Sequence, residues 1–142
     1  METTNTTEAT GSCLCGAVTI HANTLKTSVG ACHCSMCRKW AGGPLMVVDC
    51  GEALTIKGED NVSRFDSSEW GERAFCKNCG SHLFYRLKLN NLHLVAAGIF
   101  ESADNLVFDH QVFIDEKPEY YAFANQTHNM TGEEVFALFS ND

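Results

Sequence analysis

The residues best suited to chemistry are three closely spaced cysteines in the segment "ACHCSMCRKWAGG", residues 31–43. They are Cys32, Cys34 and Cys37, and they form a C-x-C-x-x-C pattern. Zinc held by protein side chains alone normally takes four cysteine or histidine ligands. Three cysteines therefore leave two possibilities. Another side chain completes a closed structural site, or the fourth position is open to water or substrate, as in catalytic zinc sites.

Two further cysteine pairs predict a second, closed site. Cys76 and Cys79 form a C-x-x-C pair in "FCKNCGS", and the glycine that follows is typical of a zinc knuckle. A thioredoxin-like redox pair would need a βαβ setting, which the sequence pattern lacks. Cys13 and Cys15 form a C-x-C pair in "GSCLCGAV". We expect this segment to be extended, so that both side chains point to one face and the two pairs share one four-sulfur site.

Few other residues are candidates to complete the three-cysteine group. Cys50 ends the apolar run "PLMVVDC", which favours a buried strand end over a ligand. His33 lies between Cys32 and Cys34, so strand alternation turns it away from their metal. His82 follows the knuckle and is expected to pack or hydrogen-bond nearby. The remaining histidines show no ligand spacing: His21, His93, His110 and His128.

Two basic residues, Arg38 and Lys39, directly follow the third cysteine. One interpretation makes them substrate-binding residues, which attract an anionic substrate or stabilise a charged metal–thiolate group. The other interpretation is a solvated pair at the end of a short helix, where the helix dipole favours positive charge. Both interpretations stay open. Trp40 is expected to be a core residue rather than part of a pocket wall.

Composition limits the classes of partner. The chain has 142 residues and a formal net charge of −8, and its ten Lys and Arg residues form no basic patch. Nucleic acids and anionic membrane surfaces are therefore not expected as partners. No apolar run reaches the length of a membrane span, and the polar start "METTNTTEAT" is no secretory signal. We expect a cytoplasmic protein with reduced cysteines, a disordered tail over residues 1–10 and one domain over residues 11–142.

The elements that must position the cysteines are mostly short strands punctuated by Gly and Asn. The predicted strands are Ala17–Ala22, Leu45–Cys50, Ala53–Lys57, Arg73–Phe75, His82–Leu87, Leu92–Ile99, Phe108–Ile114 and Tyr120–Phe123. Two short helices are predicted, one after Ser35 and one in "TGEEVFALF", where Thr131 and Glu134 have the spacing of a capping box. The expected fold class is mainly β.

Four segments in this order resemble the glutathione-dependent formaldehyde-activating enzyme family, which includes centromere protein V. They are "GSCLCGAV", "CHCSMCRKWAGG", "RAFCKNCGSHLF" and "LVAAGIFE", and the resemblance spans about residues 11–115. It implies a β-tent, a zinc-bound fold of mostly antiparallel strands. It also implies two zinc ions per chain: a structural zinc on one ligand set and a second zinc with an exchangeable fourth position on the other. These sets are Cys13, Cys15, Cys76 and Cys79, and then Cys32, Cys34 and Cys37.

The activity implied by this resemblance joins formaldehyde to glutathione to give S-hydroxymethylglutathione, a reaction classed with the carbon–sulfur lyases. The expected partners are thus a small-molecule thiol such as glutathione and an aldehyde. The alternative is a non-catalytic zinc-binding module for protein interaction, which would gain nothing from an exchangeable zinc position. A chromatin role is disfavoured by the acidic charge. Three thiolates on Zn²⁺ leave one net negative charge, which favours positioning of a thiol over strong carbonyl polarisation.

Overall fold

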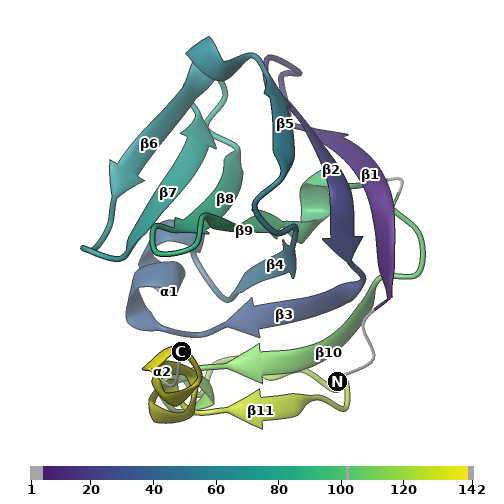
Figure 1. Ribbon diagram of the computed structural model, residues 1–142. Coiled ribbons are helices and arrows are strands. Elements are labelled where there is room, and N and C mark those ends of the chain that lie inside the picture. The colour runs from purple at the N-terminus through teal and green to yellow at the C-terminus, as the bar shows by residue number, and fades with distance from the viewer. Residues whose placement is uncertain (1–4, 102, 141–142) are drawn as a thin grey trace.

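The structure, a computed structural model, describes residues 5–101 and 103–140, and within these it forms two β-sheets and two α-helices (Figure 1). The smaller sheet has the strand order β1-β2-β5. Its strands are β1 (Thr6–Ser12), β2 (Thr19–Lys26) and β5 (Leu54–Lys57). The larger sheet has the order β11-β10-β3-β4-β9-β8-β7-β6. Its strands are β3 (Ser28–Cys32), β4 (Leu45–Asp49), β6 (Val62–Asp66), β7 (Gly71–Cys76), β8 (His82–Leu87), β9 (Leu92–Ala96), β10 (Val107–Val112) and β11 (His128–Met130).

The helical elements are short and lie between or after strands. They are α1 (Ser35–Ala41), α2 (Gly132–Ser140) and the 3₁₀ turns η1 (Glu59–Asn61), η2 (Ala97–Ile99) and η3 (Ile114–Glu116). No described helix is long and apolar enough to cross a bilayer. The mainly β prediction and both predicted helices are confirmed.

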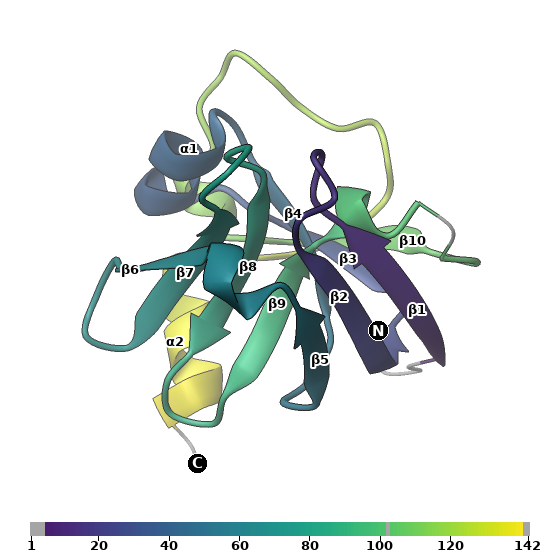
Figure 2. The ribbon, with the colours of Figure 1, turned by 90° about the horizontal axis from the view of Figure 1, so that it is seen from above.

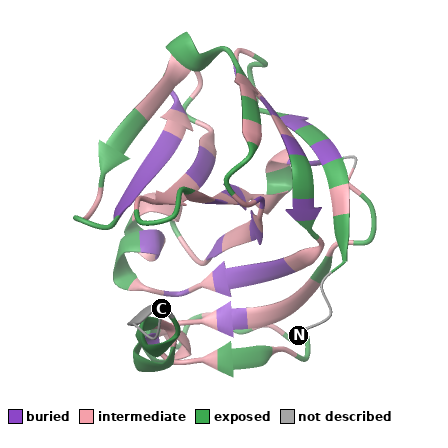
Figure 3. Cartoon of the chain, viewed as in Figure 1, coloured by how far each residue is buried: buried purple, intermediate pink, exposed green. Residues whose placement is uncertain are grey.

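The core lies where the two sheets face one another, as the two views of the ribbon show (Figures 1 and 2). Ile20 and Leu25 of β2 are fully buried in the same cluster as Val48 of β4, Phe84 of β8 and Val95 of β9. In Figure 3 the buried positions gather on β3 and β7 and recur along β2, where buried and accessible residues alternate. Most strand pairs are antiparallel, as expected for a β-tent, and β10 runs parallel to both β3 and β11.

The predicted disordered tail is wrong for residues 6–10, which belong to β1 and pair with β2. Residues 1–4 lie outside the described part of the chain. The strand forms because Ala9 and Gly11 are buried while the polar residues that alternate with them, Glu8, Thr10 and Ser12, face solvent. Threonine has a high strand propensity, so a polar composition does not prevent a half-buried edge strand.

The predicted strands agree best with the structure where apolar and polar residues alternate clearly in the sequence. His82–Leu87 is β8 with the predicted bounds, whereas the predicted strand Leu92–Ile99 ends at Ala96 and continues as η2. The predicted strand Tyr120–Phe123 is wrong, because this segment is part of a loop over residues 117–127. Its alternation has another cause, since Tyr121 and Phe123 both turn toward the ring of His33.

Three strands of the larger sheet were not predicted: β3, β6 and β11. The central residues of β3 are buried without alternation, and the strand contains a glycine, so it lacks the period-two pattern. Strand β6, with the sequence VSRFD, is polar and lies at the sheet edge. Strand β11 has only three residues.

The capping box of α2 is confirmed. The Thr131 N–H donates to Glu134 Oε1 at 2.8 Å, and the Glu134 N–H donates to Thr131 Oγ1 at 3.2 Å. Two N–H groups that the helix leaves without intrahelical partners are thereby satisfied.

Candidate metal centres

The first cysteine cluster brings together the four sulfurs that the sequence predicted, those of Cys13, Cys15, Cys76 and Cys79. All four Sγ atoms lie within 4.8 Å of one another, with 3.7 Å between Cys13 and Cys15 and 3.8 Å between Cys15 and Cys76. A tetrahedral zinc with Zn–S bonds of about 2.3 Å spaces its sulfurs about 3.8 Å apart. The donor set therefore fits a closed tetrahedral zinc.

The first pair reaches this cluster by a route that differs from the prediction. Cys13 and Cys15 do not lie in an extended segment but in a tight turn between β1 and β2. The Gly16 N–H donates to the Cys13 carbonyl oxygen at 3.1 Å, and Gly16 has a φ of +83°. The chain reversal, rather than strand alternation, aims the two sulfurs at one point.

The second pair follows the predicted knuckle geometry. Cys76 ends β7, and the Gly80 N–H donates to the Cys76 carbonyl oxygen at 2.7 Å. Gly80 has a φ of +81°, a conformation that costs glycine little because it has no Cβ atom. The turn places Cys76 and Cys79 beside the turn that carries Cys13 and Cys15.

Hydrogen-bond donors surround the sulfurs of this cluster. The Val18 N–H donates to Cys13 Sγ at 3.3 Å, and Asn78 Nδ2 donates to Cys15 Sγ at 3.2 Å. The hydroxyl of Ser81 lies 3.2 Å from Cys79 Sγ and, together with the Ser81 backbone, lowers the pKa of that thiol to about 5. Such donors stabilise thiolates, the form of cysteine that binds metal.

The second cluster consists of Cys32, Cys34 and Cys37, whose sulfurs also lie within 4.8 Å of one another. Cys32 ends β3, Cys34 is the N-cap of α1, and Cys37 is a buried residue in its first turn. The Cys37 N–H donates to Cys34 Sγ at 3.4 Å, and hydrogen bonds from the other two sulfurs lower the pKa of the Cys34 thiol. Among the described residues, no histidine, aspartate, glutamate or further cysteine joins this group.

Cys50 does not complete the second cluster. It lies in the core with only 1% of its surface exposed, and burial raises the pKa of its thiol to about 12. Strand β4 runs antiparallel to β3, with Leu45 opposite Cys32, so Cys50 lies beyond the far end of β4. The prediction of a buried strand end is confirmed.

His33 is oriented away from the cluster, as strand alternation predicted. Its side chain is fully buried, with Nδ1 2.9 Å from the Tyr121 hydroxyl and Nε2 2.7 Å from Gln111 Oε1. The contact with Tyr121 connects the backbone between Cys32 and Cys34 to the loop over residues 117–127, the arch at the top of Figure 2, and the contact with Gln111 connects it to β10.

The two basic residues after Cys37 differ in their surroundings. Arg38 Nε donates to the His33 carbonyl oxygen at 2.9 Å, so it connects α1 to the preceding cysteine segment. Lys39 is exposed on α1. The helix ends at Gly42, which has a φ of +84° and donates its N–H to the Arg38 carbonyl oxygen. Both basic residues therefore lie in the last turn, where the helix dipole favours them.

Trp40 is half-buried rather than a core residue, and its ring stacks on His82 with centroids 4.1 Å apart. The predicted packing role of His82 is confirmed by this contact. The guanidinium carbon of Arg73 also lies over the Trp40 ring, 5.2 Å from the ring centroid. The tryptophan thus forms part of the surroundings of the second cluster.

Arg73 is the residue near the second cluster that the sequence did not reveal. It lies in β7 with 3% of its surface exposed, and its Nη1 donates to Cys37 Sγ at 3.5 Å. Its Nε donates to Ser67 Oγ at 3.1 Å, and the Tyr85 ring lies 4.9 Å from its guanidinium carbon. Alternation in "GERAFC" indicates that Arg73 and Glu72 face opposite sides of the sheet, but nothing in the sequence shows that α1 covers the Arg73 side.

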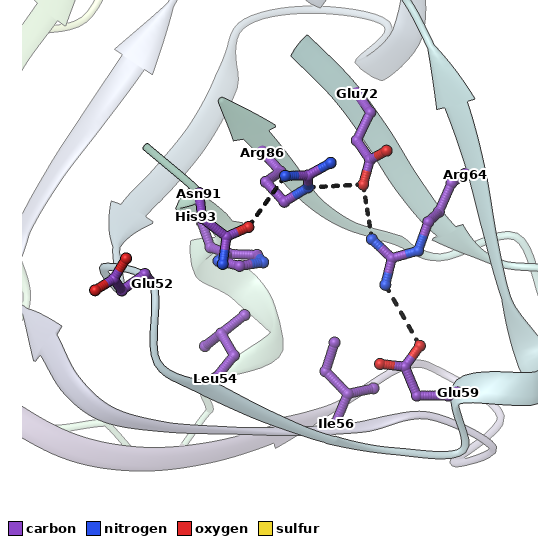
Figure 4. Close-up of a pocket in the computed structure, with 9 residues that line it drawn as sticks. All are labelled: Glu52, Leu54, Ile56, Glu59, Arg64, Glu72, Arg86, Asn91 and His93. Carbon is purple, nitrogen blue, oxygen red and sulfur yellow. Dashed lines mark hydrogen bonds and ion pairs between the residues drawn. The ribbon is translucent and has the colours of Figure 1, made fainter. Parts of the chain in front are cut away.

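The opposite face of β7 carries a separate, charged pocket of about 380 Å³ (Figure 4). Glu72 Oε2 accepts hydrogen bonds from Arg64 Nη1 at 2.7 Å and from Arg86 Nε at 2.9 Å. The bond from Arg86 makes the largest contribution to lowering the pKa of Glu72. Arg64 also pairs with Glu59. These charges compensate one another inside the pocket, so it is an ion-pair network within the fold and holds none of the predicted site residues.

The sequence model of the family described as glutathione-dependent formaldehyde-activating enzyme matches residues 8–116. The chain belongs to this family. Its match includes every cysteine of both clusters, and the resemblance carried by the cysteine motifs is confirmed.

Two relatives match between about half and nine-tenths of the chain. An uncharacterized lyase of Schizosaccharomyces pombe is 38% identical over 129 residues, which cover 90% of this chain and 94% of the relative. A putative glutathione-dependent formaldehyde-activating enzyme of Halomonas elongata is 32% identical over 83 residues, which cover 52% of this chain and 53% of the relative. A solved structure of a Rhodobacter sphaeroides protein has a TM-score of 0.58 at 24% identity, covers 67% of this chain and 90% of its own, and shows the same fold.

Proposed function

We propose that the protein is a zinc-dependent lyase that acts on the adduct of a thiol and an aldehyde, with glutathione and formaldehyde as the substrates. The observation that carries this proposal is the contrast between the two cysteine clusters. One supplies four sulfurs, and the other supplies three with no fourth ligand among the described residues. The description of the family and the names of the relatives in S. pombe and H. elongata support the reaction class.

Two zinc ions per chain fit this contrast. Cys13, Cys15, Cys76 and Cys79 would hold a structural ion, and the group Cys32, Cys34 and Cys37 would hold an ion with an exchangeable position. A zinc held by these three cysteines would lower the pKa of a coordinating thiol and, more weakly, would polarise a carbonyl oxygen. Seven of the eight cysteines lie in the two clusters and all eight are free thiols, which supports a reducing cytoplasm as the site of action.

The protein's own residues would hold the ligands of the second cluster in place. Cys34 and Cys37 are fixed by the first turn of α1, and the helix is held against the cysteine segment by the Arg38–His33 contact. His33, locked by Tyr121 and Gln111, fixes the backbone between Cys32 and Cys34. This rigidity favours bringing a thiolate and an aldehyde into contact in one orientation.

Lys39 is the better placed of the two proposed substrate-binding residues. It is exposed, whereas Arg38 already donates to a backbone oxygen. Glutathione carries two carboxylates, so an exposed ammonium group near the cluster would contribute to binding in a manner that salt weakens.

The proposed reaction is tested by following the conversion of formaldehyde and glutathione to S-hydroxymethylglutathione by exchange NMR. The zinc-loaded protein is expected to accelerate this exchange, and Cys34→Ser is expected to abolish the acceleration. Cys50→Ala is the matched control, because it removes a cysteine that lies outside both clusters. Equal rates with wild type and Cys34→Ser would contradict the proposal and favour the non-catalytic interaction module.

A further inference from the structure

Arg73 carries a positive charge in a buried position without a carboxylate partner. It is 3% exposed, and the ion pairs formed by the described residues do not include it. Its hydrogen bonds go to a neutral hydroxyl, Ser67 Oγ, and to Cys37 Sγ. The other arginines of the same sheet differ from it, because Arg64 and Arg86 both pair with Glu72.

A buried guanidinium needs a compensating negative charge. Arginine does not lose its proton in proteins, and the transfer of an unpaired ion out of water is costly. The aromatic faces of Trp40 and Tyr85 compensate for part of this cost through cation–π contacts. The remaining group in contact is Cys37 Sγ, and this sulfur is a thiolate when it binds a metal. With a metal bound, the buried charge of Arg73 and the thiolates of the second cluster would therefore stabilise one another.

This contact changes the charge balance of the second cluster. Three thiolates on a divalent zinc would leave one net negative charge, which the charge of Arg73 would neutralise. We propose that Arg73 is the counter-ion of the metal site at Cys32, Cys34 and Cys37, and that this neutrality allows the site to accept an anionic fourth ligand, a thiolate. The inference rests on the proposed function in that it concerns the same site. From the three cysteines alone, the zinc-bound site is expected to carry one net negative charge. With Arg73 included, the expected net charge is zero.

Arg73 would act as a positioning and charge-balancing residue rather than as a catalytic residue. Its guanidinium carbon lies 5.2 Å from the centroid of the Trp40 ring and 4.9 Å from that of the Tyr85 ring, and these contacts restrict its orientation toward Cys37. An anionic ligand that approaches an uncompensated anionic centre is repelled, and in a partly desolvated site this repulsion is strong. With Arg73 present, the fourth thiolate would add its charge to a neutral centre.

The experiment compares Arg73→Gln, which removes the charge, with Arg73→Lys, which keeps it. The matched control is Arg64→Gln, the same change on the neighbouring strand at a position that faces the charged pocket. For each protein, the number of zinc ions per chain is counted, and the affinity of the more weakly bound zinc is measured by competition with a chelator. Glutathione binding is measured by titration into cobalt-substituted protein while the visible absorption bands are recorded.

Arg73→Gln is expected to retain one tightly bound zinc. Its affinity for the second, weaker zinc and its affinity for glutathione are each expected to fall at least about tenfold. Arg73→Lys is expected to recover most of both affinities, and Arg64→Gln is expected to match the wild type. Wild-type affinities in Arg73→Gln, or equal losses in Arg73→Gln and Arg73→Lys, would overturn the inference. If Arg73→Gln does not fold, the Arg73→Lys variant tests the inference by itself. A charge-balancing role predicts that Arg73→Lys has near-wild-type affinities for zinc and glutathione, whereas a role of the arginine in packing alone does not.

The result also separates this inference from the proposed function. A wild-type protein that holds two zinc ions but binds no glutathione would contradict the proposed function. The zinc affinities of the Arg73 variants would then still show whether Arg73 balances the charge of the cluster.

Discussion

At the scale of the residue, the cysteines differ in the groups that surround their sulfurs. The first cluster receives hydrogen bonds from backbone and side-chain groups, including the Val18 N–H and Asn78 Nδ2. The second cluster is contacted by a buried cation, Arg73. Neutral hydrogen-bond donors are sufficient at a closed metal site, because its four ligands are complete and its net charge does not change. A full positive charge is useful at a site whose net charge becomes more negative when a further anionic ligand binds. The types of contact thus agree with one structural and one exchangeable site.

Replacing a sulfur of the first cluster is expected to unfold the protein. Cys76→Ser removes a buried ligand, and a structural zinc in small domains contributes about 10–16 kcal/mol, as much as a domain's whole stability of about 5–15 kcal/mol. Thermal melting followed by circular dichroism is expected to show no cooperative transition for Cys76→Ser. Lys77→Ala, an exposed residue of the same turn, is expected to melt like wild type. A wild-type midpoint for Cys76→Ser would refute the structural role.

His93 is expected to make stability depend on pH below neutrality. It is buried next to Phe84, and burial lowers the pKa of its imidazole below the ordinary value of about 6.5. Between these two pKa values the unfolded chain binds a proton that the native protein does not, so stability falls as the pH decreases from about 6.5 through the pKa of the native protein. Above that range His93 adds no pH dependence.

The measurement is the melting midpoint between pH 7.5 and 5.5 for wild type, His93→Gln and His128→Gln. The midpoint of His93→Gln is expected to fall less steeply with acidification than that of wild type. His128 is exposed, and its replacement is the control for loss of a histidine as such. Parallel curves for all three proteins would mean that His93 is not the origin of the effect.

At the scale of the element, the cysteines of the second cluster are positioned mainly by a short helix and a loop rather than by long strands. Helix α1 holds Cys34 as its N-cap and Cys37 in its first turn, and the loop over residues 117–127 holds His33 through Tyr121. The loop has no regular structure, yet the Lys117 ammonium donates to its Pro118 and Tyr121 carbonyl oxygens. The loop therefore has hydrogen bonds of its own and contacts the residue between two cysteines of the second cluster.

Tyr121→Phe tests this role of the loop. The change leaves His33 Nδ1 without the hydroxyl 2.9 Å away, and an unsatisfied buried polar group costs about 1–3 kcal/mol. The free energy of unfolding from denaturant titration is expected to fall by about that amount. Tyr120→Phe is the matched control, because Tyr120 is 74% exposed and its replacement is expected to have little effect. An equal, small effect of both changes would mean that the loop does not hold His33.

The sequence predicted those elements that depend on interactions between residues close together in the chain. The capping box of α2, the turn glycine after Cys79 and the strand His82–Leu87 all depend on neighbours in the chain, and all three were predicted. Strand β3 could not be recognised, because its pairing with β4 and β10 buries it without alternation. Arg73 could not be recognised either, because its role depends on α1, which lies far from it in the sequence.

At the scale of the whole molecule, the first cluster joins the two sheets. Cys13 and Cys15 follow β1 of the smaller sheet, whereas Cys76 ends β7 of the larger one, and Cys79 follows it. A metal bound there would connect segments more than sixty residues apart, since Cys15 and Cys76 are separated by 61 positions. Such pairings form slowly, so a metal that fixes them has a clear structural use. The second cluster lies between β3 of the larger sheet and α1, so it does not join the two sheets.

The most direct test of this account is glutathione binding by calorimetry to protein whose zinc content is counted on the same sample. The account predicts two zinc ions per chain and micromolar to millimolar glutathione binding in wild type. Cys34→Ser is expected to keep its fold, since serine also caps helices well, and to retain one zinc and bind no glutathione. Two zinc ions without any thiol binding in wild type, or unchanged glutathione binding in Cys34→Ser, would contradict it.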